Sequence, residues 1–129
     1  MPLLALVVDD SMLIRYTVGC FLEGRGFAVE PASNGEEALE ALKRVRPDLI
    51  VTDMQMPKMS GSEFITALKN KPETAGLPII IVAGRVSGFV ESEKRANFAI
   101  YKDIDIEEQL ARALDVVMGK ANRATAGKS

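Results

Sequence analysis

Three acidic side chains and one lysine occur where a site could form, each at or just after the end of a short apolar run: Asp9, Asp10, Asp53 and Lys102. Carboxylates that lie close together repel each other unless one binds a proton or the group binds a hard cation. A few oxygen ligands that stay partly open to water suit Mg²⁺ better than Ca²⁺. A carboxylate can also attack phosphorus and carry the phosphoryl group, while a metal ion and a lysine offset its charge. If the fold brings these side chains together, they predict a magnesium-dependent site for phosphoryl transfer.

Each of these residues also has a simpler, structural explanation. Ser11 or Asp10 can serve as the N-cap of a helix that begins at this point. An aspartate after a strand is commonly a turn residue, and a lone lysine is usually solvated. Taken one at a time, the residues favour these structural roles. The functional interpretation therefore depends on the elements that bring all four charges to one place.

Short apolar runs predict the strands of the fold. Three nearly continuous runs of Leu, Ile and Val are typical of parallel strands covered on both faces: Leu3–Val8, Leu49–Thr52 and Ile79–Val82. Phe27–Glu30 and Phe98–Tyr101 are weaker candidates for two further strands.

Helical patterns separate these runs. The sequence predicts helices over Ser11–Glu23, from the N-cap Asn34 to about Val45, over Ser60–Asn70, and from Asp105 onward. Strict alternation of strands and helices predicts an α/β fold with a doubly wound parallel sheet and right-handed crossovers. In such sheets ligands bind beyond the carboxyl ends of the strands, so we expect the four charged residues at one edge.

Composition narrows the class of protein. The 129 residues are 47% hydrophobic and 26% charged with a formal net charge of -2, which is typical of one globular domain. No basic stripe indicates direct nucleic-acid binding, and no apolar run is long enough to span a membrane. Cys20 is the only cysteine, which favours a reducing cytoplasm, and the absence of histidine excludes imidazole as a base or metal ligand.

Three stretches resemble one known family, and together they extend from about Leu3 to Met118: "LVVDDSMLIR", "PDLIVTDMQMPKMSG" and "LPIII". The chain resembles a receiver domain of the bacterial response-regulator, or CheY-like, family. The resemblance implies a five-stranded, flavodoxin-like parallel sheet in the order 2-1-3-4-5. We expect a receiver domain over residues 1–119 and a flexible C-terminal tail or linker stub over 120–129, either as a stand-alone receiver or as part of a longer regulator.

The resemblance also implies a role for each site residue. Asp53 matches the phosphoacceptor, and Lys102 matches the lysine that contacts the phosphoryl group. Asp9 and Asp10 match the pair that holds Mg²⁺ together with Asp53 and the backbone carbonyl of Gln55. Three further residues match the loop that shapes the site: Met56, Pro57 and Gly61. The implied partners are a sensor histidine kinase or histidine phosphotransfer protein, which supplies the phosphoryl group, and a downstream protein target, with no nucleic acid and no membrane.

The sequence departs from the family at three positions that bear on signalling. Ala83 stands where the family has a Thr or Ser that contacts the phosphoryl group, although the adjacent Gly84 leaves room for close backbone approach. Ala99 replaces an aromatic residue, and Tyr101, two positions on along the strand, is expected on the same face. Asp103 replaces the proline after the lysine, so we expect a trans peptide bond and some displacement of that lysine.

The segment between Ala83 and Lys102 is the weakest part of the family pattern. Its stretch "RVSGFVESEKRANF" has little amphipathic periodicity and is interrupted by Gly88. We therefore expect the fourth helix of the family to be shortened or irregular, and the usual output surface to be altered.

Two functions remain open at this point. The first is a phosphoaccepting signalling receiver with an atypical switch at Ala83, which is not an enzyme beyond self-catalysed phosphorylation and dephosphorylation. The second is a degenerate receiver that binds partners independently of phosphorylation. A magnesium phosphatase of the haloacid-dehalogenase type is disfavoured because Gln55 stands where that class has a second aspartate. The terminal "GKS" lacks the first glycine of a P-loop.

Overall fold

The computed structural model describes residues 3–84 and 94–118 of the chain. Five parallel strands form one sheet: β1 (Leu4–Val8), β2 (Ala28–Ala32), β3 (Leu49–Asp53), β4 (Ile79–Ala83) and β5 (Phe98–Tyr101). Their order is β2-β1-β3-β4-β5, with β2 and β5 at the edges. This order confirms the doubly wound, CheY-like sheet expected from the sequence.

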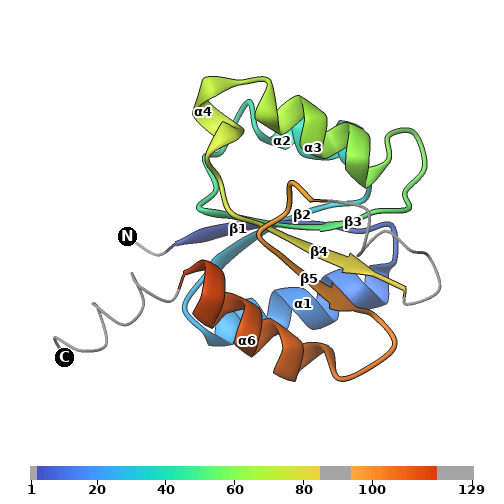
Figure 1. The fold of residues 1–129 in the computed structure, drawn as a ribbon, viewed down its shortest axis with the longest axis vertical. Helices are drawn as coiled ribbons and strands as arrows, with labels where there is room; N and C mark the ends of the chain where they lie inside the picture. The colour runs from blue at the N-terminus through green and yellow to red at the C-terminus, as the bar shows by residue number, and fades with distance from the viewer. Residues whose placement is uncertain (1–2, 85–93, 119–129) are drawn as a thin grey trace, which may run out of the picture.

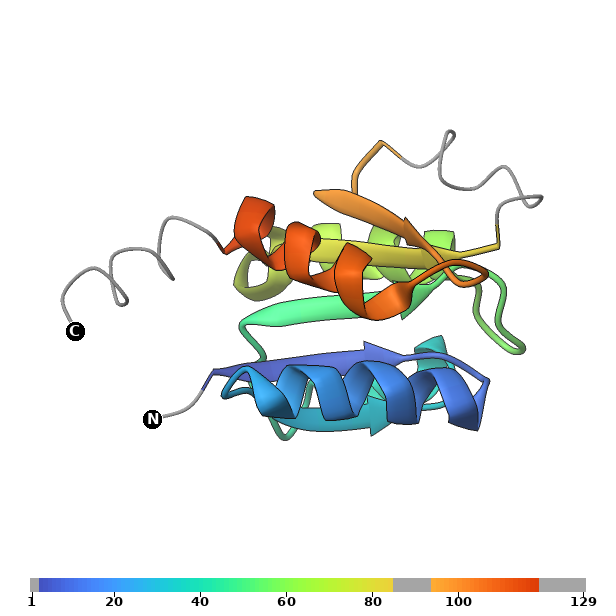
Figure 2. The same ribbon diagram turned by 90° about the horizontal axis from the view of Figure 1, so that it is seen from below.

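Helices cover both faces of the sheet (Figures 1 and 2). The helices are α1 (Met12–Gly24), α2 (Gly35–Ala41), α3 (Gly61–Lys69), the single turn α4 (Pro72–Ala75) and α6 (Ile106–Val117). Helices α1 and α6 lie against one face, and α2 and α3 lie against the other (Figure 1). Strands β3 and β4 are buried along their whole length because both of their faces are covered.

The helices begin where their capping residues predict. Ser11 and Asn34 each accept a hydrogen bond from the main chain three residues on, at 3.3 Å and 2.9 Å. Ser60 forms a reciprocal capping box with Glu63, and Asp105 caps α6. These caps satisfy amide groups that have no partner within the helix.

Several boundaries differ from the sequence prediction. Helix α2 ends at Ala41 rather than near Val45, because the following residues form tight turns with i→i+3 hydrogen bonds. Strand β2 begins at Ala28 rather than Phe27, whose amide donates back to Leu22 at the end of α1, and it extends past Pro31. Proline is tolerated there because β2 is an edge strand.

The single-turn helix α4 is absent from the sequence prediction, although Pro72 at its first position is a typical start signal. The predicted shortened or irregular helix between β4 and β5 falls largely on residues 85–93, and the C-terminal tail on 120–129. Both segments lie outside the residues that the structure describes.

Gly61 allows α3 to begin directly against the end of β3. A Cβ at this position would overlap the carbonyl oxygen of Asp53 and lie 2.7 Å from the Cα of Met54. The backbone cannot relieve such a contact by changing a rotamer.

We therefore expect Gly61→Ala to lower the free energy of unfolding by about 1–3 kcal/mol. Gly24→Ala is the matched control, because a Cβ at the end of α1 meets nothing within 4 Å. It should raise stability by about 0.5–1 kcal/mol. Urea denaturation of both variants measures the difference, and equal stability of the two would contradict the close approach at Gly61.

Candidate functional site

The carboxyl ends of β1, β3 and β5 bring the predicted charges together. The ammonium of Lys102 lies 2.9 Å from Oδ2 of Asp53 and 3.3 Å from Oδ2 of Asp9. One carboxylate oxygen from each of Asp9, Asp10 and Asp53 lies within 4.8 Å of the others. Asp9 and Asp53 are buried, at 2% exposure each, whereas Asp10 is exposed. All four residues therefore meet at one edge of the sheet, as the sequence analysis required.

Local main-chain geometry holds the carboxylate of Asp53. Its Oδ1 accepts hydrogen bonds from the amides of Met54 at 2.7 Å and Gln55 at 3.3 Å. The buried hydroxyl of Thr52 donates to the Asp53 carbonyl at 2.9 Å. These bonds orient Oδ1 toward the loop and leave Oδ2 directed at Lys102.

Asp9 is fixed in the same way at the end of β1. Its Oδ1 accepts from the amide of Ser11 at 2.9 Å, and its own amide donates to the carbonyl of Ala32 at 3.1 Å. The guanidinium of Arg15 on α1 donates to the carbonyl of Asp9 at 2.7 Å. The first turn of α1 thus positions this acid.

Lys102 reaches the acids despite the missing proline. The described residues contain no cis peptide bond, so the expected trans bond between Lys102 and Asp103 is confirmed. The amide of Lys102 donates to the carbonyl of Ala83 at 3.0 Å, which ties the end of β5 to the end of β4. Any displacement of the main chain leaves the ammonium within ion-pair distance of two carboxylates.

Burial and like charge disfavour ionisation of the acids. Burial raises the pKa of Asp9 to about 6, and the charge of Asp53 adds to the increase. The hydrogen bond from the Ser11 amide and the charge of Lys102 lower the pKa in part. Burial also raises the pKa of Asp53, with Lys102 acting in the opposite direction. Burial lowers the pKa of Lys102, but its ion pair with Asp53 and the negative charge of Asp9 outweigh this and raise it overall. The folded state therefore disfavours the charged form of both buried acids, although Lys102 opposes this effect.

The residues present fit a hard cation. Oδ2 of Asp9 and Oδ2 of Asp53 are buried and make no hydrogen bond within the described part of the chain, although both face the ammonium of Lys102. The exposed Asp10 adds a third carboxylate on the open side. An oxygen-only set that is partly open to water matches the requirements of Mg²⁺. Gln55 lies in the loop beside Asp53, where its amide contacts Oδ1, and the use of its carbonyl as a ligand stays a prediction.

Two of the departures from the family pattern, Ala83 and Ala99, pack on the same face of the sheet. The methyl group of Ala83 is 2% exposed and packs in the apolar cluster under α2 and α3, which Ala99 also joins. Phe98 packs in the cluster on the opposite face, as strand alternation predicts. Tyr101 is half-buried at the end of β5, and a Cβ on Gly84 would meet nothing within 4 Å.

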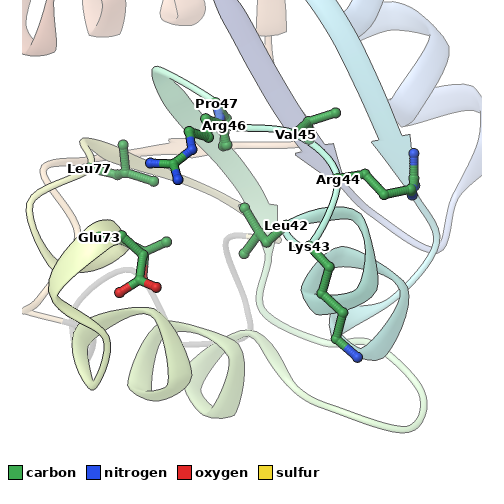
Figure 3. Close-up of a pocket in the computed structure, with 9 residues that line it drawn as sticks. Leu42, Lys43, Arg44, Val45, Arg46, Pro47, Glu73 and Leu77 are labelled. Carbon is green, nitrogen blue, oxygen red and sulfur yellow. The ribbon is translucent and has the colours of Figure 1, made fainter.

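A pocket of about 180 Å³ lies away from these acids, beside the start of β3 (Figure 3). It lies between the loop that follows α2 and the turn α4. Two of its basic side chains already have acidic partners, since Lys43 pairs with Glu40 at 3.2 Å and Arg44 pairs with Glu30 at 3.3 Å. None of the four charged residues at the carboxyl edge lines this pocket.

Sequence reasoning missed three residues that support the site. Arg15 holds the main chain of Asp9, Thr52 holds that of Asp53, and Gln109 of α6 bonds to the main chain of Tyr101. Each acts on a backbone group that is distant or inconspicuous in the sequence. Of the three, Thr52 was visible in the sequence, because a polar residue follows the apolar residues Leu49–Val51 of the same strand.

Comparison with known proteins identifies the family. The response regulator receiver domain model matches residues 5–114, and the chain belongs to this family. Chemotaxis response regulator CheY4 of Vibrio cholerae has a similar structure, with a TM-score of 0.80 and 31% identity over 91% of this chain and 99% of that one. The receiver domain of sensor histidine kinase PA1611 from Pseudomonas aeruginosa, solved with magnesium in its active-site cleft, shares the fold at a TM-score of 0.81 and 20% identity over 92% of this chain and 99% of that one.

Longer curated relatives contain the same domain. Response regulator MprA of Mycolicibacterium vanbaalenii is 35% identical over 118 residues, which cover 87% of this chain and 49% of the relative. The chain therefore spans about half the length of such relatives, or less. No helix in the described ranges 3–84 and 94–118 is long and apolar enough to cross a membrane.

Proposed function

We propose that this receiver domain accepts a phosphoryl group on Asp53 in a magnesium-dependent reaction. The observation that carries the proposal is the position of Asp53 Oδ2, which is buried, lacks a hydrogen bond, and lies 2.9 Å from the ammonium of Lys102. Asp9, Asp10 and Asp53, with the carbonyl of Gln55, would hold Mg²⁺. When bound, the ion supplies positive charge that offsets the charge on the phosphoryl oxygens.

In the reaction, a carboxylate oxygen of Asp53 attacks phosphorus. A new O–P bond forms, and the P–N bond of a phosphohistidine, or the P–O bond of an acyl phosphate, breaks with its electron pair leaving on the donor. Lys102 lies where its ammonium can bind an oxygen of the transferring group. The proposed donor is a histidine kinase or a histidine phosphotransfer protein, and the absence of histidine from these 129 residues agrees with a role as recipient.

Incubation with acetyl phosphate and Mg²⁺, followed by intact-mass measurement, tests this function. We expect one phosphate adduct per chain, and no adduct when Mg²⁺ is removed by chelation. Absence of any adduct on the wild-type protein at saturating Mg²⁺ and donor would reject the proposal.

A second function is favoured by the setting of Ala83. Its buried methyl group cannot move toward a phosphoryl group as a hydroxyl would, so the domain could bind its target independently of phosphorylation. Amide NMR spectra with Mg²⁺, before and after addition of beryllofluoride, distinguish the two. Shifts that extend to Tyr101, β5 and α6 indicate a working switch, and shifts confined to the ends of β1 and β3 indicate an interaction module.

The proposal also includes a cellular location and a class of target for the domain. We place the domain in the cytoplasm, where its single Cys20 stays reduced and phosphodonors are available. Its direct target is taken to be a protein rather than nucleic acid or a membrane, because the net charge of -2 provides no basic stripe.

A further inference from the structure

The side chain of Gln109 forms a two-point contact with the end of β5. The amide of Tyr101 donates to Oε1 of Gln109 at 2.9 Å, and Nε2 of Gln109 donates to the carbonyl of Tyr101 at 2.8 Å. The same Nε2 also donates to the carbonyl of Asp105 at 3.2 Å. One half-buried side chain thus bonds to both ends of the loop that joins β5 to α6.

This contact lies next to the lysine of the site. β5 is an edge strand of the sheet formed by the described residues, and the outer side of Tyr101 faces away from β4. The primary amide of Gln109 supplies the donor and acceptor that such a strand would supply. On the inner side the amide of the next residue, Lys102, donates to the carbonyl of Ala83 at 3.0 Å.

The main chain at Lys102 is therefore anchored from two sides. The residues that follow it, Asp103 and Ile104, are exposed, and Asp103 adds no ring that would restrict the backbone. The Lys102 side chain must place one ammonium between two carboxylates, at 2.9 Å and 3.3 Å. Loss of the outer anchor would free the start of this loop and spread the ammonium over several positions.

We propose that Gln109 is a positioning residue that fixes Lys102 through the main chain of Tyr101. This inference rests on the proposed phosphoryl transfer for its functional consequence. This role requires a side chain of the length of glutamine that both accepts from the Tyr101 amide and donates to the Tyr101 carbonyl. Glutamate would offer Tyr101 two acceptors and repel its carbonyl, and methionine would keep the volume but remove both bonds.

The test compares Gln109→Met with Arg112→Met, a change on the same helix at an exposed side chain that pairs with Glu108 at 2.9 Å. The initial rate of phosphorylation by acetyl phosphate is measured at saturating Mg²⁺. We expect Gln109→Met to be slower by about tenfold or more and Arg112→Met to be unchanged, since misplacement of a positioned group by about 1 Å can cost a hundredfold. Binding of Mg²⁺ should be unaffected, because its proposed ligands come from the residues just after β1, from the end of β3 and from the loop after β3.

A double-mutant cycle separates positioning from a general loss of stability. In a Lys102→Met background, Gln109→Met should cause no further loss of rate, while its effect on thermal unfolding should persist. An equal loss of rate in both backgrounds would overturn the proposal.

A second readout does not depend on phosphoryl transfer. We expect the two Hε protons of a fixed Lys102 to have distinct NMR shifts in the free protein, and these shifts to merge in Gln109→Met but not in Arg112→Met. Distinct, unchanged shifts in Gln109→Met would overturn the positioning role even if the protein accepts phosphate. Conversely, merged shifts in Gln109→Met alongside a wild-type protein that takes up no phosphate would retain the positioning role and reject the proposed function.

Discussion

Asp53→Asn is expected to abolish the phosphate adduct and, at the same time, to make the folded domain more stable. The amide of asparagine keeps the shape of the side chain but is not a nucleophile for phosphorus at neutral pH. It retains an oxygen that can accept from the amides of Met54 and Gln55. The loss of phosphate uptake should therefore be complete without disturbing the loop that follows β3.

The gain in stability follows from the electrostatics of the site. Burial raises the pKa of Asp53 even though Lys102 opposes the shift, so the folded state disfavours the charged carboxylate. Replacing it with a neutral group removes this penalty, and Lys102 keeps its ion pair with Asp9 at 3.3 Å. We therefore expect the free energy of unfolding at pH 7 without Mg²⁺ to rise.

Intact mass and urea denaturation measure the two effects. Asp115→Asn, the same change at an exposed position on α6, is the control and should change neither. A phosphate adduct on Asp53→Asn would place the acceptor elsewhere. A less stable Asp53→Asn would show that the ion pair with Lys102 outweighs burial.

The sheet and the meeting of the acids could be predicted because both depend on local patterns. Apolar runs of about five residues that alternate with capped helices specify parallel strands, and parallel strands place their carboxyl ends at one edge. This rule predicts that Asp9, Asp53 and Lys102 lie at the same edge, but not that their strands are neighbours. The family resemblance then supplied the strand order, which periodicity alone does not determine.

The supports of the site could not be predicted because they depend on tertiary contacts of the main chain. Arg15 bonds to a carbonyl group six residues earlier, and Gln109 bonds to an edge strand eight residues earlier. Either side chain would pass as a solvated residue on a helix. The early end of α2 has the same origin, since packing and the turn before Pro47 override helix propensity.

The apo-protein should lose stability as the pH rises through the range in which Asp9 ionises. The pKa of Asp9 is about 6 in the folded state against 3.8 for an unperturbed aspartate, so the folded state binds its proton more tightly than the unfolded chain. This contribution to stability is present below about pH 4 and is lost as the pH rises to about 6. Asp9→Asn, which cannot ionise, should lack this part of the pH dependence and be more stable at pH 7.

Magnesium should reverse this trend, because the ion must displace the proton from Asp9 before the carboxylate can bind it. We expect the affinity for Mg²⁺ in the wild type to fall about tenfold per unit as the pH is lowered below about 6. Asp9→Asn should bind Mg²⁺ at least tenfold more weakly at pH 7 and show a shallower dependence on pH, because a proton on residue 9 then no longer competes with the ion. Isothermal titration calorimetry between pH 5 and pH 8 measures both, with Asp115→Asn as the control that should follow the wild type. Equal affinity and equal pH dependence for Asp9→Asn and wild type would remove Asp9 from the ligand set, and with it the explanation for its buried, unbonded Oδ2.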